Sequence, residues 1–178
     1  MNALKEFIIP IKGLSNIIYR YTFQVTPEFF SHFENSEIQS GNFDVEMILD
    51  KRVGFFELTF NIKGKFNTDC DRCTASIELP MTSSQHLTVK MSEETVDEDA
   101  EIIFIHPDTS HFNVASYIYE FIILSMPFNR VYACEKDNPR PCDMKVLEIL
   151  EKNSIQEQKI VEKEKNPFED LKNKFNSN

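Results

Sequence analysis

Glycine and tryptophan are scarce in this chain of 178 residues, which has four glycines and no tryptophan. None of the glycines lies in a G-x-G-x-x-G or G-K-S/T context, so no loop that cradles phosphate groups is expected. The four histidines are scattered, and neither an H-E-x-x-H pair nor a G-x-S-x-G element occurs. We therefore expect no enzymatic activity, no catalytic residue and no small-molecule substrate.

Long apolar segments are also missing. No run of eighteen or more apolar residues occurs, so the sequence predicts no membrane span. The first residues lack the basic segment, the apolar segment and the small-residue cleavage site of a secretory signal peptide. We therefore expect a cytoplasmic protein with no membrane partner.

Basic residues are outnumbered, because 29 Asp and Glu face 19 Lys and Arg and the formal net charge is −10. Phosphate binding relies on dense Lys and Arg, so this charge argues against a general nucleic-acid binder. Residues 93–101 carry acids and no base. Such a run is either a solvated loop or a segment that docks a basic partner, for example a ribosomal protein.

The aromatic content favours a sheet-rich core, since the chain has 16 phenylalanines and each buries a large area without a polar atom. Apolar alternation and β-branched runs predict strands, and capping signals with 3.6-residue periodicity predict helices. The strands are expected at residues 7–11, 17–25, 43–49, 53–66, 75–81, 85–91 and 102–105, and the helices at a short turn after Thr26, at 111–126 and at 144–151.

These elements predict an α+β fold, a mostly antiparallel β-sheet body with one main helix. We expect residues 1–150 to form a single domain. Residues 151–178 are rich in Glu, Lys, Gln and Asn, so we expect a charged C-terminal tail that is flexible and partly helical.

Four cysteines are all that the chain contains, and they fall as Cys70-x2-Cys73 and Cys134-x7-Cys142. Two thiolates separated by two residues can face one zinc ion, and a second pair folded against them would complete a tetrahedral site. The second spacing is wider than the usual two to four residues. The pattern predicts a structural zinc site with these four cysteines as the metal ligands.

Three other interpretations of the cysteines stay open. Reduced cysteine often packs as a small apolar side chain, so all four can be structural thiols. Disulfides are a second alternative, although cytosolic thiols are usually kept reduced. A thioredoxin-like redox pair is a third, but that motif belongs at the start of a helix, whereas Cys70 follows a predicted strand.

The order of motifs resembles a known family. Cys70, Arg72 and Cys73 form a C-x-R-C segment at the end of a hairpin, an apolar helix at 117–127 ends at a proline, and a cysteine-bearing loop follows. A closing segment at residues 166–171, Asn-Pro-Phe-Glu-Asp-Leu, is similar to a D-P-R-x-x-x-L element. Together these features, over about residues 40–175, resemble the YceD family of large ribosomal RNA subunit accumulation proteins.

This resemblance implies a non-enzymatic role in the bacterial cytoplasm, in the synthesis, processing or stability of 23S ribosomal RNA and in large-subunit assembly. The implied partners are ribosomal RNA or a pre-large-subunit particle. The chain departs from the family at its second cysteine pair, because members often carry a longer loop with a G-L-C-P element. We expect Arg72 at the exposed edge of the metal site, as a contact residue for RNA or a protein partner. The alternative is an acidic adaptor that binds a basic, ribosomal-protein-like partner.

Overall fold

The computed structural model describes residues 3–34, 36–38, 40–93, 102–134 and 137–163. They form two compact units: unit 1 comprises Met1–Thr68 and Ile77–Arg130, and unit 2 comprises Asp69–Ser76 and Val131–Asn178. Most of the predicted acidic run, and residues 164–178 of the predicted tail with its closing 166–171 segment, lie outside the described residues.

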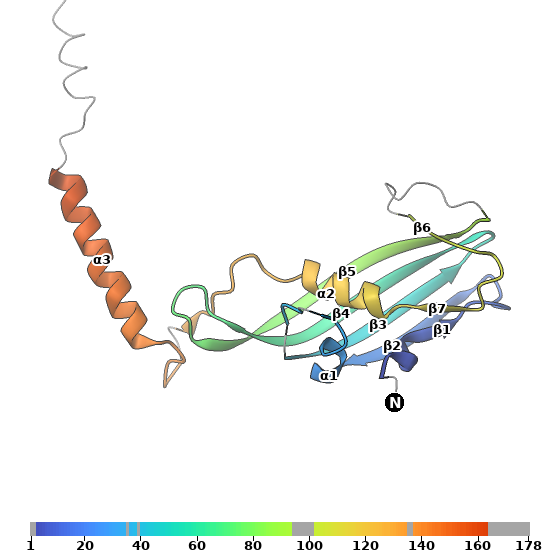
Figure 1. The fold of residues 1–178 in the computed structure, drawn as a ribbon, viewed down its shortest axis with the longest axis horizontal. Coiled ribbons are helices and arrows are strands. Elements are labelled where there is room, and N and C mark those ends of the chain that lie inside the picture. The colour runs from blue at the N-terminus through green and yellow to red at the C-terminus, as the bar shows by residue number, and fades with distance from the viewer. Residues whose placement is uncertain (1–2, 35, 39, 94–101, 135–136, 164–178) are drawn as a thin grey trace, which may run out of the picture. The chain divides into compact units, whose positions relative to one another are not determined.

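Unit 1 is built on a five-stranded sheet in the order β2-β3-β4-β5-β6 (Figure 1). Its pairs β2–β3 and β3–β4 are antiparallel, with Phe23 opposite Val45 and Met47 opposite Phe60. The strands are β2 (Ile18–Val25), β3 (Gly41–Lys51), β4 (Phe55–Asp69), β5 (Ser76–Met91) and β6 (Ile102–Ile105). The predicted α+β fold with a mostly antiparallel sheet is therefore confirmed.

A short second sheet and the helices of unit 1 cover one face of the large sheet. Strand β1 (Ile8–Pro10), which follows the 3-10 helix η1 (Ala3–Phe7), pairs with β7 (His111–Asn113), and α2 (Ala115–Leu124) continues from β7. The ring of Phe121 on α2 lies 5.2 Å from that of Phe60 on β4. The ring centre of Phe30, on α1 (Pro27–Phe30), lies 6.1 Å from that of Phe43. The core is thus largely aromatic, as the phenylalanine content predicted.

The opposite face of the sheet is polar. Arg20 pairs with Glu46 at 3.1 Å, and Lys65 pairs with Glu78 at 2.9 Å. Ser84 donates a hydrogen bond to Asn61 Oδ1 at 2.9 Å. Because side chains alternate across a strand, the same residues that bury one apolar face place these groups on the other.

Four elements differ from the sequence prediction. The two strands expected at 75–81 and 85–91 are one strand, β5, and β6 pairs with β5 in parallel, with Val89 opposite Ile103. The helix expected from residue 111 begins at Ala115, because residues 111–113 pair with β1 as β7. The helix expected at 144–151 continues to residue 163 as α3 (Met144–Lys163). Pairing between distant segments decides three of these differences, and local patterns do not report it.

The predicted boundary at residue 150 lies within α3, and the division into one domain and a tail stays a prediction. No helix in the described part of the chain is both long enough and apolar enough to cross a membrane.

Lys51, at the end of β3, is a buried cation. Its side chain is 8% exposed, and its Nζ lies 3.7 Å from Met91 Sδ and 5.5 Å from the centre of the Phe56 ring. Burial lowers the pKa of Lys51 below its usual value, because the charged form loses hydration. The charge therefore costs folding free energy that the ring contact only partly offsets.

We predict that Lys51→Met raises the free energy of unfolding at neutral pH by about 1 kcal/mol, since a buried charge is replaced by an apolar chain of similar length. The gain should shrink as pH rises toward the usual lysine pKa, because the unfolded wild-type chain binds more protons than the folded one in that window. Urea unfolding at several pH values measures this. Lys90→Met, at an exposed lysine on β5, is the control and should change little. A loss of stability in Lys51→Met would contradict the prediction.

Candidate functional site

The turn that joins β4 to β5 carries the first cysteine pair. Thr74 donates its N–H to the Cys70 carbonyl, and Cys70 donates its N–H to the Ala75 carbonyl, each at 2.8 Å. Thr74 has a φ of 57°, in the left-handed region that non-glycine residues rarely adopt. The chain therefore reverses tightly over Asp71, Arg72 and Cys73, with Thr74 in the left-handed conformation that several short hairpin loops require.

Cys70 and Cys73 are buried free thiols in this turn. Burial by itself would raise the pKa of Cys70. Backbone hydrogen bonds from Arg72, Cys73 and Tyr132, and a side-chain hydrogen bond with Cys73, outweigh it and lower that pKa below its ordinary value. The turn therefore favours a thiolate at Cys70, and the thiolate is the form that binds metals and acts as a nucleophile.

The segment that follows unit 1 in sequence brings the second pair to the same turn. Tyr132 reaches Cys70 through its backbone, and Cys134 donates its N–H to the Tyr132 carbonyl at 2.9 Å. Further on, the Asp143 carboxylate accepts the N–H of Lys145 at 2.9 Å and so caps the start of α3. Cys142 directly precedes this cap.

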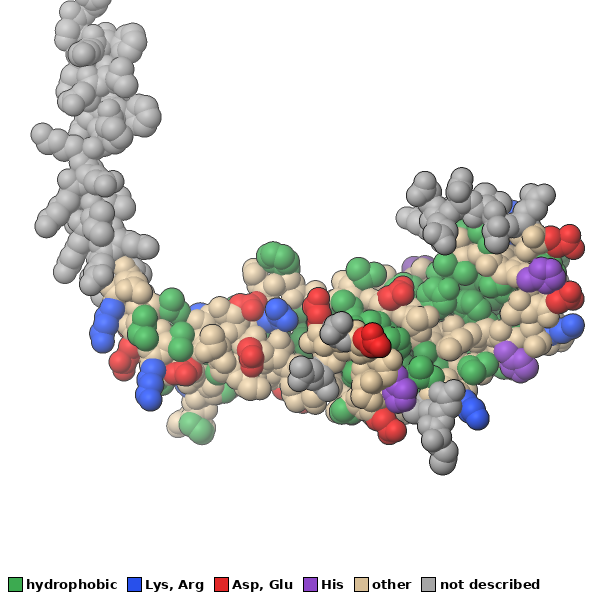
Figure 2. Space-filling model, viewed as in Figure 1, with side chains coloured by type: hydrophobic (Ala, Val, Ile, Leu, Met, Phe, Trp, Pro, Cys, Tyr) green, Lys and Arg blue, Asp and Glu red, His purple; other side chains and the backbone are tan. Residues whose placement is uncertain are grey.

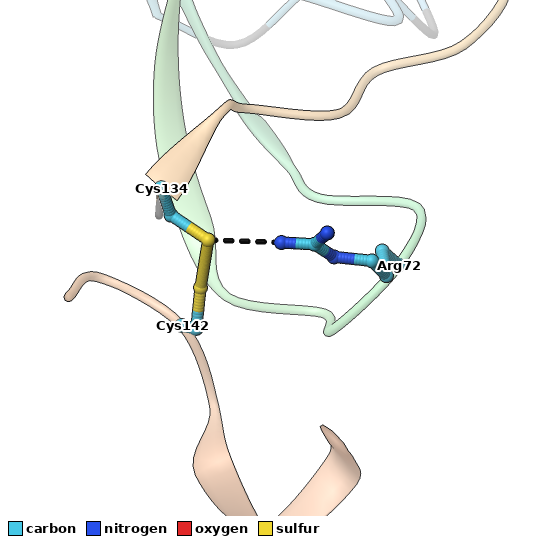
Figure 3. The surroundings of a disulfide bond; sticks show 3 residues. All are labelled: Arg72, Cys134 and Cys142. Atoms are coloured by element: carbon cyan, nitrogen blue, oxygen red, sulfur yellow. Dashed lines mark hydrogen bonds between the residues drawn. A yellow bond between two sulfur atoms is a disulfide. The ribbon is translucent and has the colours of Figure 1, made fainter. Parts of the chain in front are cut away.

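Arg72 connects the two cysteine segments (Figure 3). Its Nη2 donates to Cys134 Sγ at 2.9 Å, and its Nε is buried without a hydrogen-bond partner among the described residues. The sequence analysis expects Arg72 at an exposed edge. In the structure the side chain is instead half-buried and points at a sulfur atom. Its role as a contact for RNA or a partner stays a prediction.

Cys134 and Cys142 are joined by a disulfide. In this state no group of three or more His, Cys, Asp or Glu among the described residues is arranged to hold a metal ion. Two of the four predicted ligands bond to each other, so only the reduced chain could use all four. All four cysteines and Arg72 nevertheless belong to unit 2, so the structure brings the predicted site residues into one unit.

The hydrogen-bond donors at this site suit sulfur atoms in the thiolate form. A guanidinium cation donating to sulfur is better matched by an anionic thiolate than by a neutral disulfide sulfur, which is a weak acceptor. The backbone donors at Cys70 likewise stabilise the thiolate form of that side chain. Sequence reasoning found the cysteines and Arg72, but it missed Tyr132 and Thr74, since neither a backbone donor nor a left-handed φ leaves a signal in residue type.

The turn with Cys70 and Cys73 and the segment with Cys134 and Cys142 meet through Arg72 and define a cysteine cluster within unit 2. The family of the chain follows from comparison with known proteins. Residues 58–173 match the model of the family described as large ribosomal RNA subunit accumulation protein YceD, and the chain belongs to this family. No curated protein and no solved structure matches the chain.

The structure predicts how the thiols divide under non-reducing conditions. When the chain is purified without reductant, denatured and alkylated, Cys70 and Cys73 should be alkylated and the peptides of Cys134 and Cys142 should remain linked. Peptide mass mapping measures this, and a sample reduced before alkylation, with all four cysteines modified, is the control. A link that includes Cys70 or Cys73 would contradict the arrangement.

Proposed function

We propose that this protein supports the accumulation of 23S ribosomal RNA and the assembly of the large ribosomal subunit, as a non-enzymatic binding factor in the bacterial cytoplasm. The observation that carries the proposal is the family match over residues 58–173. The matched region includes the Cys70–Ala75 turn, α2 and the segment with Cys134 and Cys142.

The partner that we propose is a pre-large-subunit particle, contacted through ribosomal RNA or a basic ribosomal protein. Electrostatics favours the basic protein. The net charge is −10, and basic side chains on unit 1 are engaged with acids, as in Arg20–Glu46, Arg52–Asp50 and Lys65–Glu78. Figure 2 shows Lys and Arg standing singly among Asp and Glu on the face that it draws. Such a surface offers little to a phosphate backbone, whereas a cationic protein would meet mostly acids.

We further propose that the reduced chain binds one structural zinc ion through Cys70, Cys73, Cys134 and Cys142. Zinc would supply a fixed tetrahedral junction between the 70–75 turn and the segment that leads to α3. The support is the donor set itself: four cysteines within unit 2, backbone donors at the Cys70 sulfur, and Arg72 against the Cys134 sulfur.

Zinc binding is tested on the full chain after reduction. We expect about one equivalent of zinc per chain after dialysis against a zinc buffer without chelator, and a large loss in Cys70→Ser, because three remaining thiolates hold the ion more weakly. Elemental analysis measures the zinc, and circular dichroism shows whether the variant keeps its sheet. Reduced wild-type protein without zinc would refute the metal proposal and leave the ribosomal one untouched.

Depletion of the protein from cells tests the ribosomal role. We expect the ratio of 23S to 16S ribosomal RNA to fall and large subunits to decrease in gradient profiles. The wild-type chain should restore both, and a Cys70→Ser/Cys73→Ser double variant should not. A matched variant, Ser84→Ala/Thr82→Ala on the polar sheet face, should restore them like the wild type. An unchanged ratio would refute the proposed function and would favour an adaptor that acts through basic proteins outside the large subunit.

A further inference from the structure

Strand β2 lies at one edge of the large sheet, where β3 is its neighbour in the strand order (Figure 1). Lys51 donates its N–H to the Ile17 carbonyl at 3.2 Å, directly beside the register pair of Ile18 and Asp50. Backbone groups alternate in direction along an antiparallel strand, so the odd-numbered residues of β2 face β3 and the even-numbered residues face outward. Four residues therefore present their N–H and C=O groups at this side: Ile18, Arg20, Thr22 and Gln24.

These four residues, the β2 edge, are not used by the described part of the chain. No strand pairs with them on their outer side, and no turn or loop among the described residues makes a backbone hydrogen bond to them. All four are exposed, and Ile18 is 59% exposed. Such a row of donors and acceptors is a template on which a further strand can form.

The β2 edge lacks the features that usually prevent strand addition. The segment Ile18–Val25 contains no proline, glycine or lysine, and its one charged residue is Arg20. Its register with β3 runs over all eight residues without a bulge. The strand at the other edge, β6, has only four residues. Of the two edges, β2 is therefore the one that is long and regular enough to pair with another strand.

We propose that two copies of this protein pair through their β2 strands in antiparallel orientation, so that the two large sheets become one continuous sheet. The register that uses every residue of the β2 edge places Arg20 opposite Thr22 of the partner subunit, and Ile18 opposite Gln24 of the partner subunit. Each of these pairs exchanges two backbone hydrogen bonds, about eight in all.

The other face of β2 also fits a second copy of itself. In this register Tyr21 lies opposite Tyr21 of the partner subunit on the two-fold axis, and Tyr19 lies opposite Phe23 of the partner subunit. Tyr19 and Tyr21 are half-buried in one chain, whereas Phe23 is 7% exposed and stacks on Phe7 with 5.4 Å between ring centres. Aromatic cross-strand pairs stabilise a sheet, so the second copy covers aromatic surface that a single chain leaves accessible.

Charge favours a second copy over a basic segment at this edge. In the proposed register Arg20 meets a neutral threonine, and no two like charges lie directly opposite each other. A basic strand would instead place further cations beside Arg20. The carboxylates on the adjacent strand β3 are already engaged, because Glu46 accepts from Arg20 at 3.1 Å and Asp44 accepts from Gln24 at 2.6 Å. Like charges on neighbouring strands are unfavourable, so the basic occupant is disfavoured.

Sedimentation of the full chain in the presence of reductant tests the dimer. One strand edge is a small interface, so we expect a reversible dimer with a micromolar dissociation constant, and a mass that rises with concentration from 20.8 kDa toward twice that value. Thr22→Pro should raise the dissociation constant about tenfold or more, since it removes an outward N–H without touching the β2–β3 ladder. Thr22→Val keeps this N–H and is the matched control, which should dimerise like the wild type. Circular dichroism checks that both variants keep their sheet.

Hydrogen exchange on the wild-type chain tests the edge without any substitution. Above the dissociation constant, the amides of the β2 edge should exchange slowly, and dilution should return them to fast exchange. The amides of Tyr19, Tyr21 and Phe23 point toward β3, so they should be protected at both concentrations. Equal exchange of the even-numbered amides at all concentrations would refute pairing through β2.

The register is tested by photo-oxidation with a ruthenium complex and persulfate, which couples adjacent tyrosines. We expect a dityrosine that joins Tyr21 of the two copies, identified by peptide mass mapping. Tyr21→Phe should lose this link and should still dimerise in sedimentation, because the aromatic ring and the backbone hydrogen bonds remain. A dimer whose Tyr21 residues do not couple would refute the proposed register.

The remaining outcomes separate the dimer from other occupants of the edge. A chain that is monomeric even at millimolar concentration refutes the proposal, and so does a dimer that Thr22→Pro leaves intact. If the chain is monomeric and the amides of the β2 edge gain protection only when purified large-subunit proteins are added, the edge binds a strand of another protein and the dimer is refuted. The inference goes beyond the proposed ribosomal role and does not depend on zinc, so its failure leaves the expected 23S to 16S ratio after depletion unchanged.

Discussion

The buried face of the β3–β4 hairpin is the constraint on which unit 1 depends. Met47, Leu49, Leu58 and Phe60 are all 0% exposed, and they lie opposite one another in the register of the two strands. A shift of one residue would turn this apolar set to solvent. The hairpin therefore fixes the register of β2 on one side, and it provides the surface on which α2 packs.

The same hairpin determines where the cysteine turn forms. Strand β4 is 15 residues long, longer than its partner β3, and it leads directly into Cys70. The chain then reverses within a few residues, because β5 returns from Ser76. Strand β4 therefore begins in the core of the sheet and ends directly before the cysteine site. Buried apolar contacts stabilise the first, and directed hydrogen bonds and sulfur chemistry shape the second.

The net charge of −10 is the reason for proposing a basic protein, rather than bare RNA, as the contact on the large-subunit particle. Excess acid lowers affinity for phosphate at every distance that salt does not screen. Arg72, in the cysteine site, donates a hydrogen bond to the Cys134 sulfur.

The sequence by itself determined the elements whose periodicity is strong: the alternating strands of the β3–β4 hairpin, the aromatic core, and the four cysteines with Arg72. These depend on side-chain spacing, which is local. Only the tertiary structure decided that residues 111–113 pair as a strand, that β6 runs parallel to β5, and that Cys134 bonds Cys142 beside Arg72. The physical reason is that the free energy of each contact depends on partners outside its own segment, which no local pattern contains. Even Cys134 and Cys142, with a sequence separation of 8, leave their pairing open in the sequence.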